Sequence, residues 1–283
     1  MTAIERRMCW AGPWLGLALL ALGGVGVQAA LGDEFSEYPQ FRHVSGLPGN
    51  AYAVDGEGVV GWEGAMSECI PLGYTPSHGS AALPYVSGSR YGGFEIGLGG
   101  HDANGTLAPM VGFGPRGHGV AVVADFVDNE LDIAMHLQGQ VLKETDSQPA
   151  VSVGVLDWSN RREATLGKHA ERGARSFYVA ATKRFEAGGR PLHVTLGFGT
   201  DRFNERPLVG ACYDVHDRVK VLTEYDGFSV NAAAAAQLLP RKKSEGIYRE
   251  EKPKQSDALI LFMGAADLKY PTVGLTYARS GLF

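Results

Sequence analysis

The sequence predicts an all-β fold, an antiparallel up-and-down barrel of about 12 strands within a range of roughly 10 to 14. Along many short stretches apolar and polar residues alternate with a period of two, as they do in strands with one apolar face. Glycine accounts for 39 of the 283 residues, which is about twice its usual share of ~7%. Because glycine in strands marks bends, bulges or close backbone contacts, this content favours a strongly curved barrel over a flat sandwich.

The first 30 residues have the composition of a secretory signal peptide. Arg6 and Arg7 form a short basic region, an apolar core spans 10–27, and small residues permit cleavage near Ala29 or Ala30. A retained membrane anchor is the alternative, because the apolar run approaches the ~18 residues that a span requires. Residues 31–56 are rich in proline and glycine, and they predict an irregular segment before a barrel domain at 57–283.

The middle of the chain predicts a series of strands. Strand-like character begins near Gly58, whereas the prolines and glycines of 74–89 predict a loop. A strand through Pro109 is tolerated only at an edge or a bulge. Residues 159–174 are polar and predict a long loop or a short surface helix. The cleanest alternation of apolar and polar residues lies between Pro109 and this polar segment. One face there carries Leu131, Ile133, Met135, Leu137 and Val141.

The segment 191–239 predicts an antiparallel meander. Its first strand has an apolar face opposite a polar or bare face, made of Leu192, Val194, Leu196 and Phe198 against His193, Thr195, Gly197 and Gly199. Two further strand-like runs, 218–225 and 228–236, are separated only by Asp226 and Gly227. Asp-Gly supplies the positive φ angles of a two-residue hairpin turn, so we expect these runs to pair.

The C-terminal part predicts a second polar insertion at 240–255 and strands at 258–266 and 272–283. The last strand carries Val273, Leu275 and Tyr277 on one face and ends on Phe283. This ending, Tyr277 and Phe283 above all, resembles the sorting signal of bacterial outer-membrane barrels. Strict alternation back from Phe283 then places 240–255 in the periplasm and the Asp226-Gly227 turn outside, the reverse of the usual loop arrangement. Either the predicted number of strands in 240–272 is wrong by one, or the barrel is atypical.

The length of the predicted strands, about ten residues between turns, matches the ~9–11 that a tilted barrel strand needs to cross a bilayer. We therefore expect the bacterial outer membrane as the location, with outer-membrane lipid and the barrel assembly machinery as partners. The alternative is a soluble periplasmic β-sandwich or lipocalin-like binding module, which would bury the apolar row 192–198 inside the protein. Removing Glu5, Arg6 and Arg7 with the signal peptide changes the formal charge from −5 to −6, which argues against a nucleic-acid partner.

The polar faces of the strands supply the candidate functional residues. In a membrane barrel they face the lumen, where they either line a pore or form a network that fills the interior. The candidates that face the lumen in this interpretation are Asp132, His136, Gln138, Gln140, His193, Thr195, Arg218, Lys220, Glu224 and Asn231.

The sequence contains no motif typical of a catalytic, cofactor or metal site. None of the eight histidines has a second histidine or a cysteine at ligand spacing, and the G-x-S-x-G nucleophile motif is absent. A barrel hydrolase would need His136 or His193 within hydrogen-bond reach of a serine or a carboxylate. Cys69 and Cys212 could form a disulfide or remain unpaired packing residues. We expect a non-enzymatic protein without a cofactor.

The segment 209–235 is similar to a strand-turn-strand segment of the YjbH-like family, which is associated with exopolysaccharide operons. The matching residues are Glu224, Tyr225, Asp226, Gly227 and Asn231. The resemblance covers roughly a tenth of the chain. It implies an outer-membrane barrel with a role in polysaccharide secretion, hence polysaccharide as a partner, and it supplies no catalytic residues. The expected function is therefore porin-like or accessory to polysaccharide export.

Overall fold

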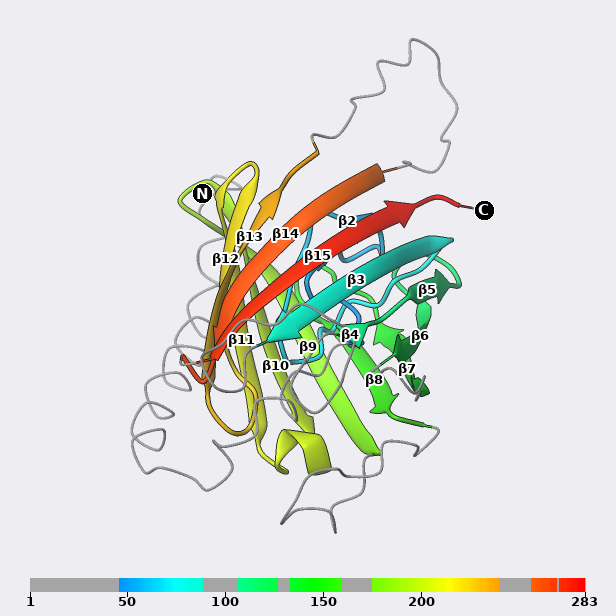
Figure 1. Cartoon of the computed structure of the whole chain (residues 1–283). Coiled ribbons are helices and arrows are strands. Elements are labelled where there is room, and N and C mark those ends of the chain that lie inside the picture. The colour runs from blue at the N-terminus through cyan, green and yellow to red at the C-terminus, as the bar shows by residue number, and fades with distance from the viewer. Residues whose placement is uncertain are drawn as a thin grey trace.

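The computed structural model describes residues 46–88, 106–126, 133–158, 175–239, 256–268 and 270–282. These residues form a closed, all-antiparallel β-barrel (Figure 1). Each strand pairs with the next in sequence, and the last strand, β15 (Tyr270–Ser280), pairs with β3 (Ser80–Gly88) to close the sheet. In the described part, β4 and β5 lie end to end between β3 and β6, so the barrel has 12 strand positions. The predicted up-and-down barrel is confirmed, and a sandwich is excluded.

The wall strands between β3 and β15 follow each other in sequence order. Their bounds are β4 (Thr106–Leu107), β5 (Met110–Phe113), β6 (Val120–Phe126), β7 (Ile133–Leu142), β8 (Ala150–Leu156), β9 (Ser176–Ala187), β10 (Arg190–Gly199), β11 (Pro207–His216), β12 (Val219–Tyr225), β13 (Val230–Gln237) and β14 (Ser256–Ala266). A short 3-10 helix, η3 (Asp201–Phe203), connects β10 to β11. Within the described residues no helix is long and apolar enough to cross a membrane.

The strand that closes the barrel, β3, lies where the sequence predicted a loop. Its proline explains the error, because Pro84 cannot donate a ladder hydrogen bond. The neighbouring strand is interrupted at this point: β4 ends at Leu107 and β5 begins at Met110. The Ala108 N–H donates to the Pro84 carbonyl across the interruption. Pro109 also lies in this break, so the expectation that it needs an irregular position is confirmed.

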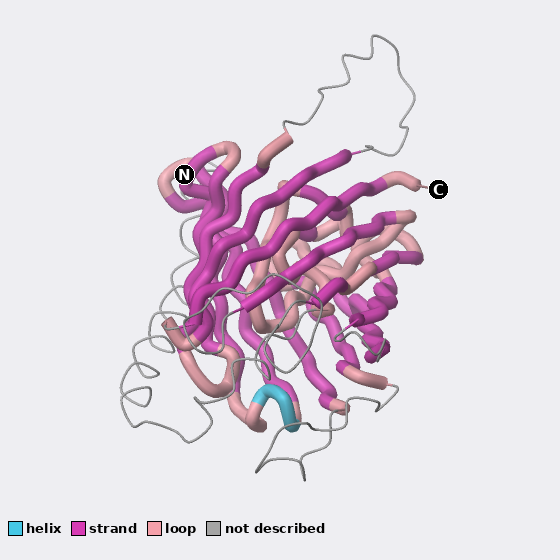
Figure 2. Tube along the Cα trace, viewed as in Figure 1, coloured by secondary structure: helices cyan, strands magenta, loops and turns pink. Residues whose placement is uncertain are grey.

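The interior of the barrel contains the segment 46–79, which we call the plug. Strand-like character is predicted from Gly58 as part of the barrel, but the two strands here, β1 (Ala53–Val54) and β2 (Val60–Gly61), pair with each other in a sheet separate from that of the wall. β2 contacts β3, β14 and β15 from inside. In Figure 2 the plug is mostly loop enclosed by the wall strands. The wall begins at Ser80, after the plug.

The two faces of the wall have opposite chemistry. On β10, His193 contacts Tyr74 of the plug and Thr195 hydrogen-bonds to Thr182 inside, while Phe198 points outward and is exposed. Leu192 and Leu196 are half-buried, and Val194 is buried. Along the other strands the outward positions expose large apolar side chains, among them Leu83, Phe113, Val120, Ile133, Met135, Val153, Phe177, Val179, Val221, Met263, Leu275 and Tyr277. The barrel therefore turns an apolar surface outward and a polar one inward.

Antiparallel pairing defines two rims. The C-terminal rim contains the end of β15, the Gly188-Gly189 turn and the turn at 217–218, whereas the opposite rim contains η3 and the turn at 226–229. This last turn differs from the prediction, because Tyr225 pairs with Val230 and four residues, not two, make the connection. The Asp226 side chain accepts the N–H groups of Phe228 and Ser229, which stabilises the longer turn.

Several predictions concern residues outside the described part of the chain. They are the signal peptide at 1–30, most of the irregular segment 31–56, the insertions at 159–174 and 240–255, and the residues Asp132 and Phe283. The strands on either side of 240–255, β13 and β14, meet it at the C-terminal rim. After 240–255 the chain forms two strands, β14 and β15, which is the number that the sequence predicts.

Candidate functional site: a barrel interior filled by the plug

The plug is almost completely enclosed by the wall. Within 46–79 the exposed residues are Glu63 and His78. Its large side chains occupy space that small inner residues of the wall leave open. Large plug residues and small wall residues belong to one buried apolar cluster. It includes Tyr52, Trp62 and Tyr74 of the plug and Ala82, Ala121, Ala150, Ala258 and Ala278 of the wall.

Gln138 of β7 is the first polar anchor of the plug. Its Nε2 lies 2.9 Å from the Tyr74 carbonyl oxygen and 2.7 Å from Thr75 Oγ1, and it donates to both. Its Oε1 accepts the hydroxyl of Tyr178, from β9, at 2.9 Å. The side chain is buried with both amide atoms engaged, which makes this a satisfied interior network rather than a water-lined surface.

Adjacent strands extend this anchor along residues 72–75. The Gly73 N–H donates to Thr182 Oγ1 at 2.7 Å, and the Ser152 hydroxyl donates to the Leu72 carbonyl at 2.6 Å. The Thr75 N–H donates to Oε1 of Gln140 at 3.0 Å. Side chains of β7, β8 and β9 thus satisfy the backbone of a plug stretch that has no sheet partner of its own, as buried backbone groups require.

Glu224 of β12 holds the plug from the other side of the barrel. Its carboxylate accepts the backbone N–H of Glu68, at 3.1 Å, and that of Cys69. The Thr272 hydroxyl of β15 donates to Oε1 of Glu68 at 2.7 Å. Asn231 supports this corner, because its amide nitrogen donates to Asp226 and its oxygen accepts the N–H of Asp267.

Lys220, also on β12, is a fully buried cation inside the barrel. Its Nζ donates to the Gly64 carbonyl at 3.1 Å, pairs with Asp214, and lies 5.2 Å from the centroid of the Trp62 ring. The Trp62 indole N–H donates to the carbonyl of Asp217 at 2.8 Å. This cluster fixes the plug near the C-terminal rim, where β11 turns into β12.

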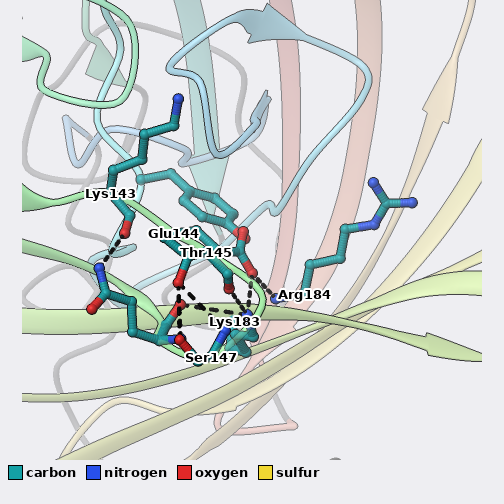
Figure 3. A network of polar contacts seen from close by, with 8 residues as sticks. Lys143, Glu144, Thr145, Ser147, Lys183 and Arg184 are labelled. Carbon is teal, nitrogen blue, oxygen red and sulfur yellow. Dashed lines mark hydrogen bonds and ion pairs between the residues drawn. The ribbon is translucent and has the colours of Figure 1, made fainter. Parts of the chain in front are cut away.

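A second polar network closes the C-terminal rim beside β7 and β8 (Figure 3). The Tyr74 hydroxyl donates to Glu144 Oε2 at 2.6 Å, and Glu144 also accepts the Arg184 N–H at 2.8 Å and pairs with Lys183. Burial raises the pKa of Tyr74 well above its ordinary value, and the charge of Glu144 raises it further. Tyr74 is therefore a neutral donor that links the plug to the β7–β8 turn.

The opposite rim is closed by apolar contacts. One buried cluster contains Leu47 and Ile70 of the plug, Phe203 of η3, and inner residues of three wall strands, Leu156, Tyr178 and Leu208. The Tyr178 and Phe203 rings meet edge to face at 5.8 Å. The connection after β10 therefore folds inward over the end of the plug instead of leaving the interior open.

The structure places most of the predicted inner residues together. Buried inner positions are occupied by His136, Gln138, Gln140, His193, Thr195, Lys220, Glu224 and Asn231. Arg218 differs, because β12 begins at Val219 and Arg218 is exposed in the turn before it. Asp132 lies outside the described residues. Tyr277 is exposed on the outer face of β15.

The partners of these residues could not be predicted from strand periodicity. Thr272, Ser152 and Thr182 each hydrogen-bond to the plug through their hydroxyl groups. One signal in the sequence could have indicated the plug, namely the alanines at inner positions of several strands. Small inner residues leave space that another segment must fill.

The histidines and cysteines form no shared site in the described residues. Nδ1 of His136 accepts the Asp157 N–H at 2.8 Å, and Nδ1 of His193 is buried without a hydrogen-bond partner. Cys69 and Cys212 are both buried, and no disulfide joins them. No three His, Cys, Asp or Glu side chains in the described part lie close enough together to hold a metal ion.

Comparison with known proteins adds no relative. The chain matches no protein-family model, and no curated protein matches it. The resemblance of 209–235 to the YjbH-like family therefore stays a prediction from those residues. The structure gives the matching residues a local role: Glu224 binds the plug, and Asp226 and Asn231 hold the adjoining turn.

Proposed function

We propose that this protein is a non-enzymatic outer-membrane β-barrel, closed in its resting state by the plug, that serves as an accessory to polysaccharide export and not as an open pore. The observation that carries this proposal is the use of the inner polar residues. Gln138, Gln140, Glu224 and Lys220 bind the plug, as do Ser152 and Thr182, so the polar inner wall does not face water.

The outer surface supports a membrane location. A soluble lipocalin-like module would bury the apolar faces of its strands and expose the polar ones, but here the exposed outward positions are large and apolar. Several strands have the length that crossing requires: β7 has 10 residues, β14 has 11 and β9 has 12. An apolar band of this kind is stabilised by contact with lipid.

The polysaccharide part of the proposal depends on the similarity of 209–235 to the YjbH-like family. Its test is the amount of exopolysaccharide that the native host produces with and without the chain. We expect reduced surface or secreted polysaccharide in the deletion strain and restoration by the intact protein. Unchanged polysaccharide would contradict this role without affecting the proposal of a closed membrane barrel.

Location and closure have separate tests. Cell fractionation should recover the protein with outer membranes, and unheated protein should migrate faster on a gel than heated protein because the barrel stays folded. In planar bilayers the wild-type protein should show no stable channel. Recovery in the soluble periplasmic fraction would contradict the location, and a steady large conductance of the wild type would contradict closure.

Gly73→Leu provides a plug-displacing variant for the conductance test. A Cβ on Gly73 would lie 2.4 Å from the Thr182 nitrogen and 2.5 Å from the Ala150 carbonyl oxygen, both backbone atoms of the wall. The plug must therefore move away from β8 and β9. We expect this variant to conduct ions. Gly139→Leu is the matched control, because nothing lies within 4 Å of its Cβ position, and it should remain closed.

A further inference from the structure

Two carboxyl groups meet where the plug is held by β12. Glu68 of the plug and Glu224 of the wall are both about 1% exposed. Glu224 accepts the backbone N–H of Glu68 itself, so the main chain of residue 68 is bound by one carboxylate while its side chain carries another. The two groups are brought together by the contact that keeps the plug in place.

The Glu68 side chain is only partly satisfied. Its Oε1 accepts the Thr272 hydroxyl, but its Oε2 is buried without a hydrogen-bond partner. A buried carboxylate oxygen without a partner is costly, whereas a neutral carboxyl group is much less so. Burial raises the pKa of Glu68 well above its ordinary value, and the negative charge of Glu224 raises it further.

The other groups around Glu68 do not offset its charge. From the β12–β13 turn, Asp226 adds negative charge, although its own oxygens are engaged by Phe228, Ser229 and Asn231. From β15 comes the neutral Thr272, and from β14 the glycine Gly264. The cation of the same wall strand, Lys220, is paired with Asp214. Among the described residues, Glu68 has no cationic partner.

We propose that Glu68 is a proton-operated latch for the plug. With its proton in place, Glu68 lies against Glu224 and the plug stays bound to β12. When the proton leaves to solvent base, two like charges face each other in a dry interior, and the stretch around Glu68 and Cys69 separates from the wall. This latch rests on the proposed function, in which the plug closes the barrel, and it adds that pH controls the closure.

The direction of the pH dependence follows from linkage. Glu68 binds its proton more tightly in the closed state than in an open state that exposes it to water. The closed state is therefore fully favoured at low pH, below the ordinary pKa of glutamate, and this preference is lost as pH rises toward the closed-state pKa of Glu68. Within that interval each pH unit changes the ratio of open to closed molecules by up to about tenfold.

Cys69 is a suitable reporter, because it is buried in the plug and its N–H is bound to Glu224. In the full chain with Cys9→Ser and Cys212→Ala, we would measure the rate of maleimide labelling of Cys69 against pH. Dividing by the rate of a free thiol peptide at each pH removes the chemistry of the thiol itself. We expect the normalised rate to rise by up to about tenfold per pH unit.

Glu68→Gln is the decisive variant, because it keeps the Oε1 acceptor for Thr272 but carries no titrating proton. It should label more slowly than the wild type and show a smaller rise in the normalised rate, and the rise that remains comes from Glu224, which is equally buried. Glu224→Gln removes the negative charge that faces Glu68. The normalised labelling rate of this variant should therefore rise over a narrower range of pH. A Glu68→Gln protein with the wild-type rise, or a wild type without one, overturns the latch. Should Glu68→Gln fail to fold, an unchanged rise in Glu224→Gln would do the same.

The latch can fail separately from the proposed function. Labelling is measured on folded protein in detergent, and the gel mobility of the unheated protein checks that it is folded. The result does not depend on the cellular location of the protein. A periplasmic location found by fractionation would contradict the proposed membrane role and leave the latch intact. A flat labelling profile would contradict the latch and leave the closed barrel intact.

Discussion

Lys220 shows at the scale of one residue how the interior depends on a paired charge. The side chain is fully buried, and its partner Asp214 keeps slight access to water. Lys220→Ala leaves Asp214 without a cation and Gly64 without a donor, so the free energy of unfolding should fall by about 3 kcal/mol, near the lower end for a broken buried pair. Urea unfolding in detergent measures this loss, and protease cleavage within 46–79 reports whether the plug loosens.

The control for Lys220 is an ion pair at the same rim. Arg190 and Asp217 pair at 3.0 Å, but Asp217 is mostly exposed. Arg190→Ala should therefore cost at most about 1 kcal/mol, as exposed pairs do. Equal losses in the two variants would mean that Lys220 does not act as a buried cation.

At this scale a period of two is enough to predict that Gln138, His193 and Glu224 share the inner face of the wall. What these side chains bind is not predictable in the same way. The Glu224 carboxylate binds backbone N–H groups that lie more than 150 residues earlier in the chain, and periodicity contains no information on such distant contacts. Arg218 was misplaced because its strand begins one residue later.

The elements of the wall are fitted to each other by residues of unequal size. Gly154 of β8 is directly opposite Tyr178 of β9, and a Cβ there would lie 2.2 Å from Cζ of the ring. Gly154→Ala must displace Tyr178 and disturb its hydrogen bond to Gln138. We expect a loss of about 1–3 kcal/mol in the free energy of unfolding, as for other overpacked positions, measured by urea unfolding.

A double-mutant cycle tests that mechanism. If Gly154→Ala acts by displacing the ring, it should cost little in a Tyr178→Ala background. Gly139→Ala, with open space at its Cβ position, should be close to neutral in either background. A loss that persists without the Tyr178 ring would locate the strain in the backbone of β8 instead.

The element that sequence patterns failed to predict is β3, and the reason is physical. Proline and glycine usually end strands, yet in a closed sheet a proline is acceptable where the neighbouring strand is itself interrupted. Pro84 lies beside the β4–β5 break, so the missing donor leaves no ladder bond unmade. The plug was mistaken for wall because its apolar residues, such as Val60 and Trp62, are buried like those of a strand.

For the whole molecule, the two rims determine how the barrel would sit in a membrane. Outer-membrane barrels place their short turns in the periplasm, and the short turns at 188–189 and 217–218 share a rim with the end of β15. β13 ends and β14 begins at this same rim, which agrees with the unusual arrangement that the sequence predicts. β3 and β8 end at the opposite rim.

The outer surface makes a prediction about the whole barrel that separates a membrane protein from a soluble one. Leu275 and Leu282 are both 46% exposed, but Leu275 lies at the middle of β15 and Leu282 lies beyond its end, at the rim. Leu275→Lys should reduce the stability of the barrel folded into lipid vesicles by about 2–4 kcal/mol, whereas Leu282→Lys should cost only about 0–1 kcal/mol, because a lysine costs most at the bilayer midplane. Urea titration of folding into vesicles, followed by gel mobility, measures both. On a soluble protein the two positions would meet the same water and the two variants would behave alike, so equal stabilities would contradict the membrane location.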